Sequence, residues 1–188
     1  MTGRNFFKKY KKLILFALKI LFIVPFPLRL FLFDCLAGAP GKIGVGLRYL
    51  LLRTLCSSCG DNVYIGRWCS LKNINKLIIG NNVSVHDYCY FDAKGNIEIG
   101  DNVSIAHNST ILSFEHSFSD FTQPIKYQPL EYGKVLINDD VWIGCGCRVL
   151  SGTIIYNRTI VGANSVVKHQ IGPGVYVGSI AKKVKDFR

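Results

Sequence analysis

Histidine is the side chain best suited to taking a hydroxyl proton near neutral pH, and the chain has four: His86, His107, His116 and His169. His116 differs from the others because it lies within residues 113–136, a 24-residue stretch that interrupts a regular repeat. Long insertions in compact domains usually carry function, so His116 is the favoured general base. His86 and His107 fall where the repeat places turns, and a solvated corner is the alternative for both.

The seven cysteines do not form a recognisable disulfide framework, because their number is odd and the chain is not a small cysteine-dense domain. Cys56 and Cys59 have the spacing of redox and zinc motifs, but no second pair follows, as a zinc ribbon requires. Several other cysteines lie at repeat positions that favour a small side chain. We expect a reducing, cytosolic compartment and no metal site.

These side chains must be positioned by a repeat that starts near residue 57. Gly60-Asp-Asn-Val63, Gly80-Asn-Asn-Val83 and Gly100-Asp-Asn-Val103 recur every 20 residues, and Asn138-Asp-Asp-Val141 is a degenerate copy. A finer six-residue period places an aliphatic or aromatic residue at Ile65, Leu71, Ile79, Val85, Phe91, Ile99, Ile105, Ile111, Ile137, Ile143, Val149, Ile155, Val161 and Val167.

Three six-residue steps make one turn of a triangular solenoid, with a short strand on each side and a tight turn at each corner. The aliphatic residues would point inward and stack from turn to turn. The 20-residue spacing adds two residues per early turn, near Leu77 and Ile97. The pattern therefore predicts a mainly β chain, a parallel β-helix over residues 57–188, from which 113–136 emerges as an extruded loop.

The formal net charge of +11 is concentrated at one end of the chain. Residues 1–56 hold ten of the 23 basic residues and one of the 12 acidic ones, so the β-helix is nearly neutral. A basic chain can bind nucleic acid or an anionic membrane. Here the charge alternates with aliphatic residues and is absent from the solenoid, which argues against nucleic acid.

Residues 13–33 are mostly apolar and follow a basic run, but Lys19, Pro25 and Pro27 interrupt them. The favoured interpretation is a helix–Pro–helix element within residues 1–40 that lies in a membrane interface. A true span, a cleaved signal peptide and the covering of an apolar face in an oligomer are the alternatives. We expect a peripheral or monotopic protein on the cytoplasmic face of a bacterial inner membrane.

Several motifs together resemble the hexapeptide-repeat O-acetyltransferases. They are the hexads, Ser113-Phe-Glu-His116-Ser-Phe-Ser-Asp120, Val141-Trp-Ile-Gly144, Val161-Gly-Ala-Asn-Ser165-Val-Val and Ala181-Lys-Lys-Val. That family includes galactoside and maltose acetyltransferases and enzymes of capsule, O-antigen and exopolysaccharide clusters. The resemblance implies a left-handed β-helix, a homotrimer with active sites between subunits, acetyl-coenzyme A as co-substrate and no metal.

The resemblance also implies roles for particular residues. His116 would act as general base in direct transfer to a sugar hydroxyl, with Glu115 or a loop carbonyl orienting its ring. His107, Asn108 and Asp92 would lie on the acceptor side. The residues implied to contact the coenzyme are Trp142, Gly144, Cys145, Ala163, Lys168, Lys182 and Lys183. Trp142 would line the pantetheine arm, Cys145 would offer its backbone N–H, and the lysines would face the phosphates.

The sequence departs from the family pattern at two places. His169 stands where the family has a lysine, with Lys168 one place early, and Gly178-Ser-Ile replaces Gly-Asn-Pro near the C-terminus. The leading function is O-acetylation of a saccharide in cell-surface polysaccharide synthesis, and a lipid-linked saccharide is the acceptor that a membrane-docked enzyme suits. The alternatives are N-acylation of an amino-sugar nucleotide or a drug, a zinc lyase resembling γ-carbonic anhydrases, and a non-catalytic scaffold. The zinc lyase would need three histidines, yet His86 and His107 are 21 residues apart, one off the repeat.

Overall fold

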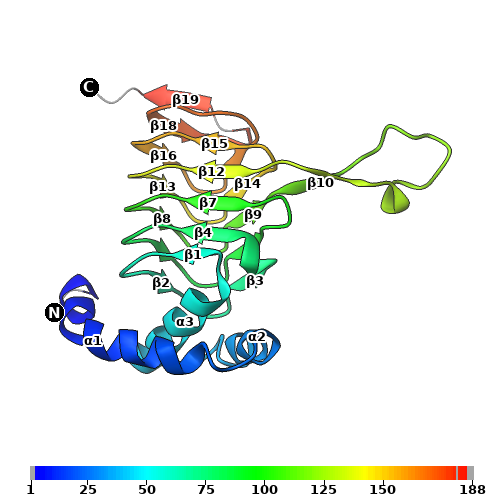
Figure 1. Cartoon of the computed structure of the whole chain (residues 1–188). Helices are drawn as coiled ribbons and strands as arrows, with labels where there is room; N and C mark the ends of the chain where they lie inside the picture. Colours follow the sequence, from blue (N-terminus) through cyan, green and yellow to red (C-terminus); the bar gives the residue numbers. More distant parts are fainter. Residues whose placement is uncertain (1–2, 181, 186–188) are drawn as a thin grey trace.

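The computed structural model describes residues 3–180 and 182–185, and shows a prism of stacked parallel strands with helices across one end (Figure 1). The chain winds repeatedly through three parallel sheets, called here sheets A, B and C. This confirms the predicted mainly β chain of stacked parallel strands. Ala181, part of the basic C-terminal motif, lies outside the described residues.

The strands of each sheet follow one another along the prism. Sheet A contains β1 Ser58–Cys59, β4 Leu77–Ile79, β7 Ile97–Ile99, β12 Val135–Ile137 and β15 Ile154–Ile155. Sheet B contains β2 Tyr64–Ile65, β5 Ser84–Val85, β8 Ser104–Ile105, β13 Trp142–Ile143, β16 Thr159–Val161, β18 Gly174–Val177 and the antiparallel β19 Lys182–Lys185. Sheet C contains β3 Ser70–Lys72, β6 Tyr90–Asp92, β9 Thr110–Leu112, β14 Arg148–Val149 and β17 Val166–Val167.

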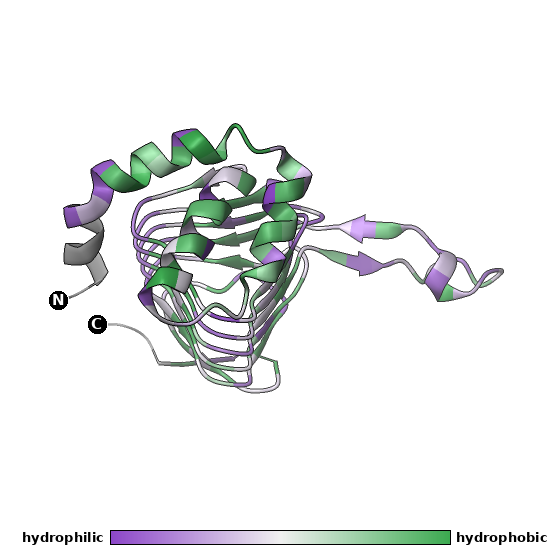
Figure 2. Ribbon diagram, turned by 90° about the horizontal axis from the view of Figure 1, so that it is seen from below, coloured by the Kyte–Doolittle hydropathy of each residue, from purple (hydrophilic) through white to green (hydrophobic). Residues whose placement is uncertain are grey.

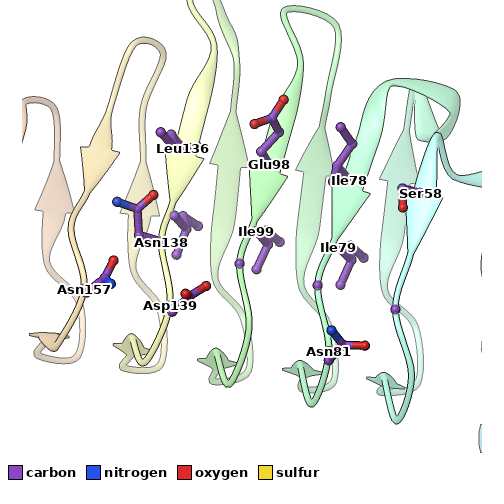
Figure 3. A pocket seen from close by; sticks show the side chains of 14 residues that line it. Ser58, Ile78, Ile79, Asn81, Glu98, Ile99, Leu136, Asn138, Asp139 and Asn157 are labelled. Carbon is purple, nitrogen blue, oxygen red and sulfur yellow. The ribbon is translucent and has the colours of Figure 1, made fainter.

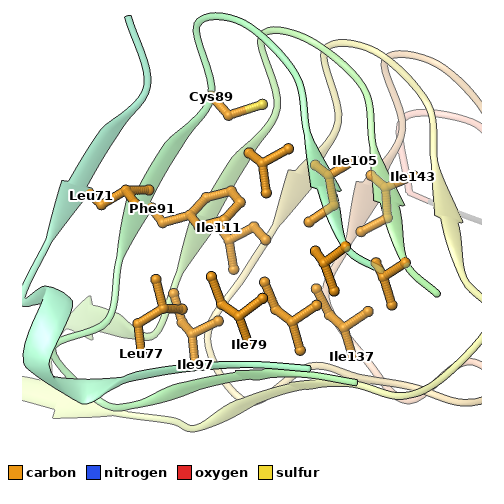
Figure 4. Packing of buried hydrophobic residues seen from close by; sticks show 14 of the residues in the cluster. Leu71, Leu77, Ile79, Cys89, Phe91, Ile97, Ile105, Ile111, Ile137 and Ile143 are labelled. Atoms are coloured by element: carbon orange, nitrogen blue, oxygen red, sulfur yellow. The ribbon is translucent and has the colours of Figure 1, made fainter. Parts of the chain in front are cut away.

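The six-residue period builds the core of the prism. Every aliphatic or aromatic side chain that it predicts to point inward is buried. Successive coils stack in register, as when Ile79 pairs with Ile99 and Ile99 with Ile137 (Figure 4). Burying one isoleucine contributes roughly 1.5–3 kcal/mol, so this stack is the main source of stability. The cysteines buried at small-residue positions, as predicted, are Cys69, Cys89 and Cys147.

The repeated Gly-Asp-Asn-Val tetrads form the corner between sheets A and B. Asn62, Asn82 and Asn102 adopt the left-handed conformation there, with φ of 57°, 56° and 58°, which asparagine tolerates. Their amides form a ladder, because Asn62 Nδ2 donates to Asn82 Oδ1 at 3.0 Å and Asn82 Nδ2 to Asn102 Oδ1 at 3.2 Å. At Gly80 a Cβ would lie 2.4 Å from Asp101 Oδ1, so the approach of the next coil requires glycine.

The extra residues of the early turns lie where the spacing predicted them, at the corner that leads back to sheet A. Before Leu77, Asn73 is left-handed and the 3₁₀ helix η1 Ile74–Lys76 follows it. Before Ile97, Asn96 is left-handed with φ 75°, and its N–H donates to the carbonyl of Ala93. These insertions lengthen one corner without shifting the inward positions.

Residues 113–136, predicted as a loop, form instead a two-stranded arm that projects from the prism (Figures 1 and 2). The antiparallel strands are β10 Phe114–His116 and β11 Leu130–Tyr132, and the 3₁₀ helix η2 Ile125–Tyr127 lies near the tip. Sheet A resumes at Val135, one residue inside the predicted limit. The arm leaves the prism at the corner between β9 of sheet C and β12 of sheet A.

Three helices cover the end of the prism next to the first coil. They are α1 Gly3–Leu21, α2 Phe26–Cys35 with Pro25 as its N-cap, and α3 Gly41–Leu55 with Pro40 as its N-cap. The break at Pro25 confirms the predicted helix–Pro–helix element. Among the described residues, none of the helices has both the length and the apolar content needed to cross a bilayer.

Two of the N-terminal basic residues, Arg29 and Arg48, are buried and do not contribute to the surface charge of this segment. Arg48 is buried and donates to the carbonyls of Ile65 and Ala39, at 2.9 and 2.7 Å. Desolvation by burial lowers the pKa of Arg48. Arg29 is also buried and donates to the carbonyl of Thr54. These two cations cap carbonyl groups at the joint between helices and prism, because backbone acceptors there lack water.

Candidate active site

His116 lies on the arm with its side chain exposed. It is the last residue of β10 and pairs across the arm with Leu130, while Glu115 pairs with Glu131. Neighbouring residues of a strand point to opposite faces, and among the described residues no hydrogen bond joins Glu115 to the His116 ring, so its role in orienting the ring stays a prediction. Within the described residues the His116 ring makes no hydrogen bond, which leaves its nitrogen atoms open to a substrate.

The arm that carries His116 is ordered by its own polar groups. The side chain of Gln128 is buried; its Oε1 accepts from the N–H of Asp120 at 3.1 Å, and its Nε2 donates to the Asp120 carbonyl at 2.7 Å. The Asp120 carboxylate accepts from the hydroxyl and N–H of Thr122 and from Gln123 Nε2, and these hydrogen bonds lower its pKa. These bonds hold the turn of the arm in one conformation.

Asp92, predicted to contact the acceptor, lies in the corner at the base of the arm. Its side chain is buried, accepting a hydrogen bond from Asn73 Nδ2 at 2.6 Å and another from the N–H of Lys94 at 3.2 Å. The carbonyl of Asp92 accepts from the Ser113 hydroxyl, which itself accepts from the N–H of Gly95. The Oδ1 atom and the backbone carbonyl of Asp92 are thus used within the corner, and its contact with the acceptor stays a prediction.

His107 and Asn108 form an exposed corner between sheets B and C. Asn108 is left-handed with φ 59°, and its carbonyl accepts from Arg148 Nη1 at 2.9 Å. The His107 carbonyl accepts from the N–H of Gly146 on the next coil. Their backbone groups shape this corner, and their side chains are free to face solvent or a ligand.

Trp142 lies on the outer face of sheet B, with 54% of its surface exposed. It stands in register between Ser104 and Ile160, while the next residue, Ile143, points into the core. An exposed tryptophan amid smaller neighbours forms a flat apolar wall. Trp142 is therefore not a core residue.

The corner between sheets B and C begins after Trp142 and Ile143 with Gly144 and Cys145. Ala163 lies at the same corner of the next coil. A Cβ at Gly144 would lie 2.6 Å from the backbone nitrogen of Ala163, so glycine is needed for close stacking of the coils. The carbonyl of Cys145 accepts from the N–H of Asn164 at 2.8 Å. The Cys145 N–H makes no hydrogen bond within the described residues, and is therefore a donor available to a ligand.

The three lysines predicted to face phosphates lie towards the end of the prism opposite the helices (Figure 1). Lys168 follows β17, the last strand of sheet C, and is exposed. Lys182 and Lys183 lie on β19, which pairs with β18 so that Lys183 is opposite Tyr176. All three can reach solvent with their amino groups, as contact with a phosphate would require.

The structure therefore separates the predicted site into two parts. Trp142, Cys145 and Ala163 lie along sheet B and its corner with sheet C. His116 lies on the arm, which leaves at the corner between sheets C and A and points away from the prism (Figure 2). One chain does not bring the histidine to the tryptophan.

A groove of 410 Å³, which was not predicted from the sequence, lies on the outer face of sheet A (Figure 3). Ile78, Glu98 and Leu136 lie along it in register, and Asn138 and Asp139 line the end nearer the corner with sheet B. Each of the first three directly precedes an inward-pointing residue. The sequence could have predicted which residues line this face, because the residue before an inward residue of a strand faces outward.

All seven cysteines are free thiols. Among the described residues, no three histidine, cysteine or acidic side chains are grouped so that they could hold a metal ion.

Comparison with curated proteins finds acyltransferases, although no family model matches the chain. WbbJ of Escherichia coli K12, a candidate lipopolysaccharide biosynthesis O-acetyl transferase, is 34% identical over 166 residues, covering 83% of this chain and 77% of that protein. The dTDP-4-amino-4,6-dideoxy-D-glucose acyltransferase of Escherichia coli is 31% identical, covering 69% of this chain and 81% of that one. A candidate acetyltransferase of Mycobacterium tuberculosis is 34% identical, and the chain spans only 36% of its length.

Solved structures with the same fold are also acyltransferases. A maltose O-acetyltransferase from Clostridium difficile 630 superposes with a TM-score of 0.78 and 27% identity, covering 89% of each chain. A Vibrio cholerae hexapeptide-repeat acetyltransferase complexed with acetyl-coenzyme A has a TM-score of 0.76 but 22% identity, over 85% of this chain and 86% of that one. A mutant of AntD, an N-acyltransferase from Bacillus cereus in complex with dTDP and coenzyme A, has a TM-score of 0.58 and 25% identity, over 70% and 84%.

Proposed function

The chain belongs to the hexapeptide-repeat acetyltransferases, and from this premise we propose that it moves an acetyl group from acetyl-coenzyme A to a saccharide hydroxyl in cell-surface polysaccharide synthesis. The observation that carries the proposal is the exposed, unpartnered imidazole of His116 on an ordered arm, within the part of the chain that the structure describes. The likeness to a candidate lipopolysaccharide O-acetyl transferase over most of both chains supports the acceptor class.

The coenzyme would lie along sheet B. Trp142 would pack against the pantetheine arm, and Gly144 and Ala163 would leave room for it beside the corner. The amino groups of Lys168, Lys182 and Lys183 would pair with its phosphates, which charge-assisted hydrogen bonds favour. The N–H of Cys145 would donate to the thioester carbonyl, where negative charge develops during transfer.

The reaction would be a direct transfer. His116 takes the proton of the sugar hydroxyl while that oxygen attacks the thioester carbonyl carbon. A C–O bond forms, the C–S bond breaks, and the proton held by His116 passes to the departing thiolate. No residue needs to become acylated, and holding both substrates in one site supplies much of the rate.

We propose that a homotrimer completes this site, with the arm of one subunit reaching sheet B of the next, around a β-helix of left-handed sense. The separation of His116 from Trp142 supports this assembly, because in a single chain the proposed base and the tryptophan proposed to contact the coenzyme lie on different sides. The apolar side chains of the arm support it too, since Phe121 is 96% exposed and Phe118 and Tyr127 are also exposed. Such residues are typical of interface anchors.

The test is acetyl transfer by the purified protein, measured as thiol release from acetyl-coenzyme A with saccharide acceptors. His116→Ala is expected to lower turnover by about 10²–10⁴-fold, which is what a general base contributes. His86→Ala is the matched control, because it removes an exposed histidine from the prism and leaves the arm unchanged. Undiminished turnover in the His116 variant would contradict its role.

A second candidate is N-acylation of an amino-sugar nucleotide. It is favoured by the 31% identity to the dTDP-4-amino-4,6-dideoxy-D-glucose acyltransferase, of which the chain covers 81%. The same base and coenzyme face would serve, with an amine in place of the hydroxyl. A panel of hydroxyl and amino acceptors separates the two, since faster transfer to the amino sugars would select this candidate.

A further inference from the structure

The helical end of the molecule exposes an apolar surface, called here the end face. Leu18 of α1 and Phe33 of α2 are buried on its inner side, against the rest of the chain. The outer side chains are between 37% and 82% exposed, and they are Leu13, Leu15, Phe16, Ile20, Phe22, Ile23, Phe26, Leu28, Phe31 and Ile43. Figure 2 shows how hydrophobic residues dominate these helices. So many exposed apolar side chains on the helices of one end of the molecule mark an interaction site.

The same helices carry a strong positive charge. Lys9, Lys12, Lys19 and Lys42 are exposed on α1 and α3, and Asp34 is the single acidic residue in residues 1–56. Two copies joined through their end faces would bring lysine towards lysine. An anionic bilayer satisfies both properties at once, because its headgroups attract the lysines and its acyl boundary accepts the apolar side chains.

The end face is held in its outward orientation by contacts with the prism. Arg48 links α3 to β2 and to the α2–α3 connection through hydrogen bonds to carbonyls of Ile65 and Ala39. At the first coil, the Asp61 carboxylate pairs with both Lys11 of α1 and Arg53 of α3, each at 2.6 Å. The helices therefore cannot turn their apolar side inward without breaking these bonds.

A guanidinium contact fixes the α1–α2 turn in the same way. Arg29 donates to the carbonyl of Thr54 on α3, and its guanidinium carbon lies 5.5 Å from the ring of Phe22 and 5.8 Å from that of Phe26. The two rings flank the break between α1 and α2, and both are partly exposed. The turn between α1 and α2, which carries the 82% exposed Ile23, is thus held against α3 by Arg29.

We propose that the end face docks the protein on an anionic lipid bilayer as a monotopic element, with the prism axis standing up from the membrane. The arm leaves the third coil, which is two strand spacings, or about 10 Å, above the first. The helical layer adds about 10 Å. His116 would then lie roughly 20 Å above the bilayer surface, within reach of a saccharide carried on a lipid. This last step, the acceptor, rests on the proposed function.

The experiment is co-sedimentation of the full-length protein with vesicles of phosphatidylcholine alone and of phosphatidylcholine mixed with phosphatidylglycerol. We expect tighter binding to the mixed vesicles, weakened but not abolished by salt. The variant Phe16→Ser/Ile20→Ser/Ile23→Ser removes two exposed side chains of α1 and one of the α1–α2 turn, and is expected to lose binding by tenfold or more. Lys12→Gln/Lys19→Gln should weaken binding to mixed vesicles only, by about fivefold for each lysine.

The matched control is Tyr88→Asn, which removes a 56% exposed aromatic residue from the prism and keeps a residue suited to its left-handed backbone. It should bind vesicles like the wild type. Docking is overturned if the wild type ignores mixed vesicles, if the triple variant binds equally well, or if light scattering shows that the end face joins copies of the chain.

Activity separates this inference from the proposed function. The triple variant should still release thiol with a soluble saccharide acceptor while losing transfer to acceptors embedded in vesicles. Retained vesicle binding without any acetyl transfer would reject the proposed function and leave the docking intact. Equal transfer to embedded acceptors by both proteins would reject the lipid-linked acceptor.

Discussion

The reactivity of a single side chain in this protein depends on whether the fold exposes it or buries it. The imidazole of His116 is exposed on the arm. The thiols of Cys56 and Cys59 lie where helix α3 meets the first coil, and burial raises the pKa of Cys59 to about 12 and that of Cys56 well above its usual range. Only a thiolate binds zinc or attacks a disulfide, so this pair is chemically quiet at neutral pH despite its spacing.

Alkylation tests this at the residue scale. With iodoacetamide at neutral pH, we expect the exposed Cys35 to be labelled well before Cys59, as followed by peptide mass spectrometry. Labelling of Cys59 should keep rising with pH up to about 12, beyond the range in which an ordinary thiol levels off, because only the thiolate reacts. Denatured protein, the control, should be labelled at both. Equal rates at Cys35 and Cys59 in the folded protein would show the pair to be reactive.

Elements of the prism are defined by their corners as much as by their strands. The strands are two to four residues long, too short to be stable alone, so each coil depends on its neighbours. At the corner between sheets A and B, the asparagine ladder lets every coil turn tightly and satisfies the amide of the coil beside it. Asn82 occupies its centre, donating to Asn102 and accepting from Asn62.

Substitution at Asn82 measures the strength of this corner. Asn82→Ala places a less tolerant residue at φ 56° and breaks two hydrogen bonds, so the free energy of unfolding should fall by about 2 kcal/mol. Asn82→Gly keeps the conformation accessible and should cost less. Urea unfolding followed by circular dichroism gives the values, with Asn157→Ala, an exposed corner asparagine, as control. A smaller loss for alanine than for glycine would contradict the ladder's conformational role.

The molecule as a whole has two functional ends and one projecting arm. The helices cover the first coil, the lysines lie near the last, and the arm leaves from between (Figure 1). A β-helix can place groups this way because its coils set their heights along one axis. The arm with His116 and the outer face of sheet B with Trp142, where the coenzyme is proposed to bind, lie on different sides of the prism. The proposed activity therefore depends on the assembly of several chains.

Mixed assemblies test that dependence. His116→Ala and Trp142→Ala chains should each be poorly active, the second through weaker coenzyme binding. When the two are co-expressed in equal amounts, random trimers should regain roughly a quarter of the wild-type sites, because some interfaces combine an intact histidine with an intact tryptophan. The separately purified proteins, mixed without exchange, are the control. Activity no greater than the sum of the two variants would place both residues in one chain's site.

Much of the fold was accessible from the sequence. The six-residue period identified the inward residues, the 20-residue spacing placed the extra corner residues, and Pro25 marked the break between α1 and α2. The insertion around His116 was visible as a gap in the period. All of these are local regularities, in which a residue's position in its own turn sets its burial.

Other features depend on contacts between segments that are distant in the sequence. The pairing of β10 with β11 turned the predicted loop into an arm, and Arg29 and Arg48 became buried donors to backbone carbonyls. Asp92 joined the hydrogen bonds of its own corner through Oδ1, and His116 was placed on a different side from Trp142. The sequence by itself determined which residues repeat and which do not. The tertiary structure decided which polar groups remained free, because hydrogen bonds between distant segments follow from three-dimensional register and not from spacing along the chain.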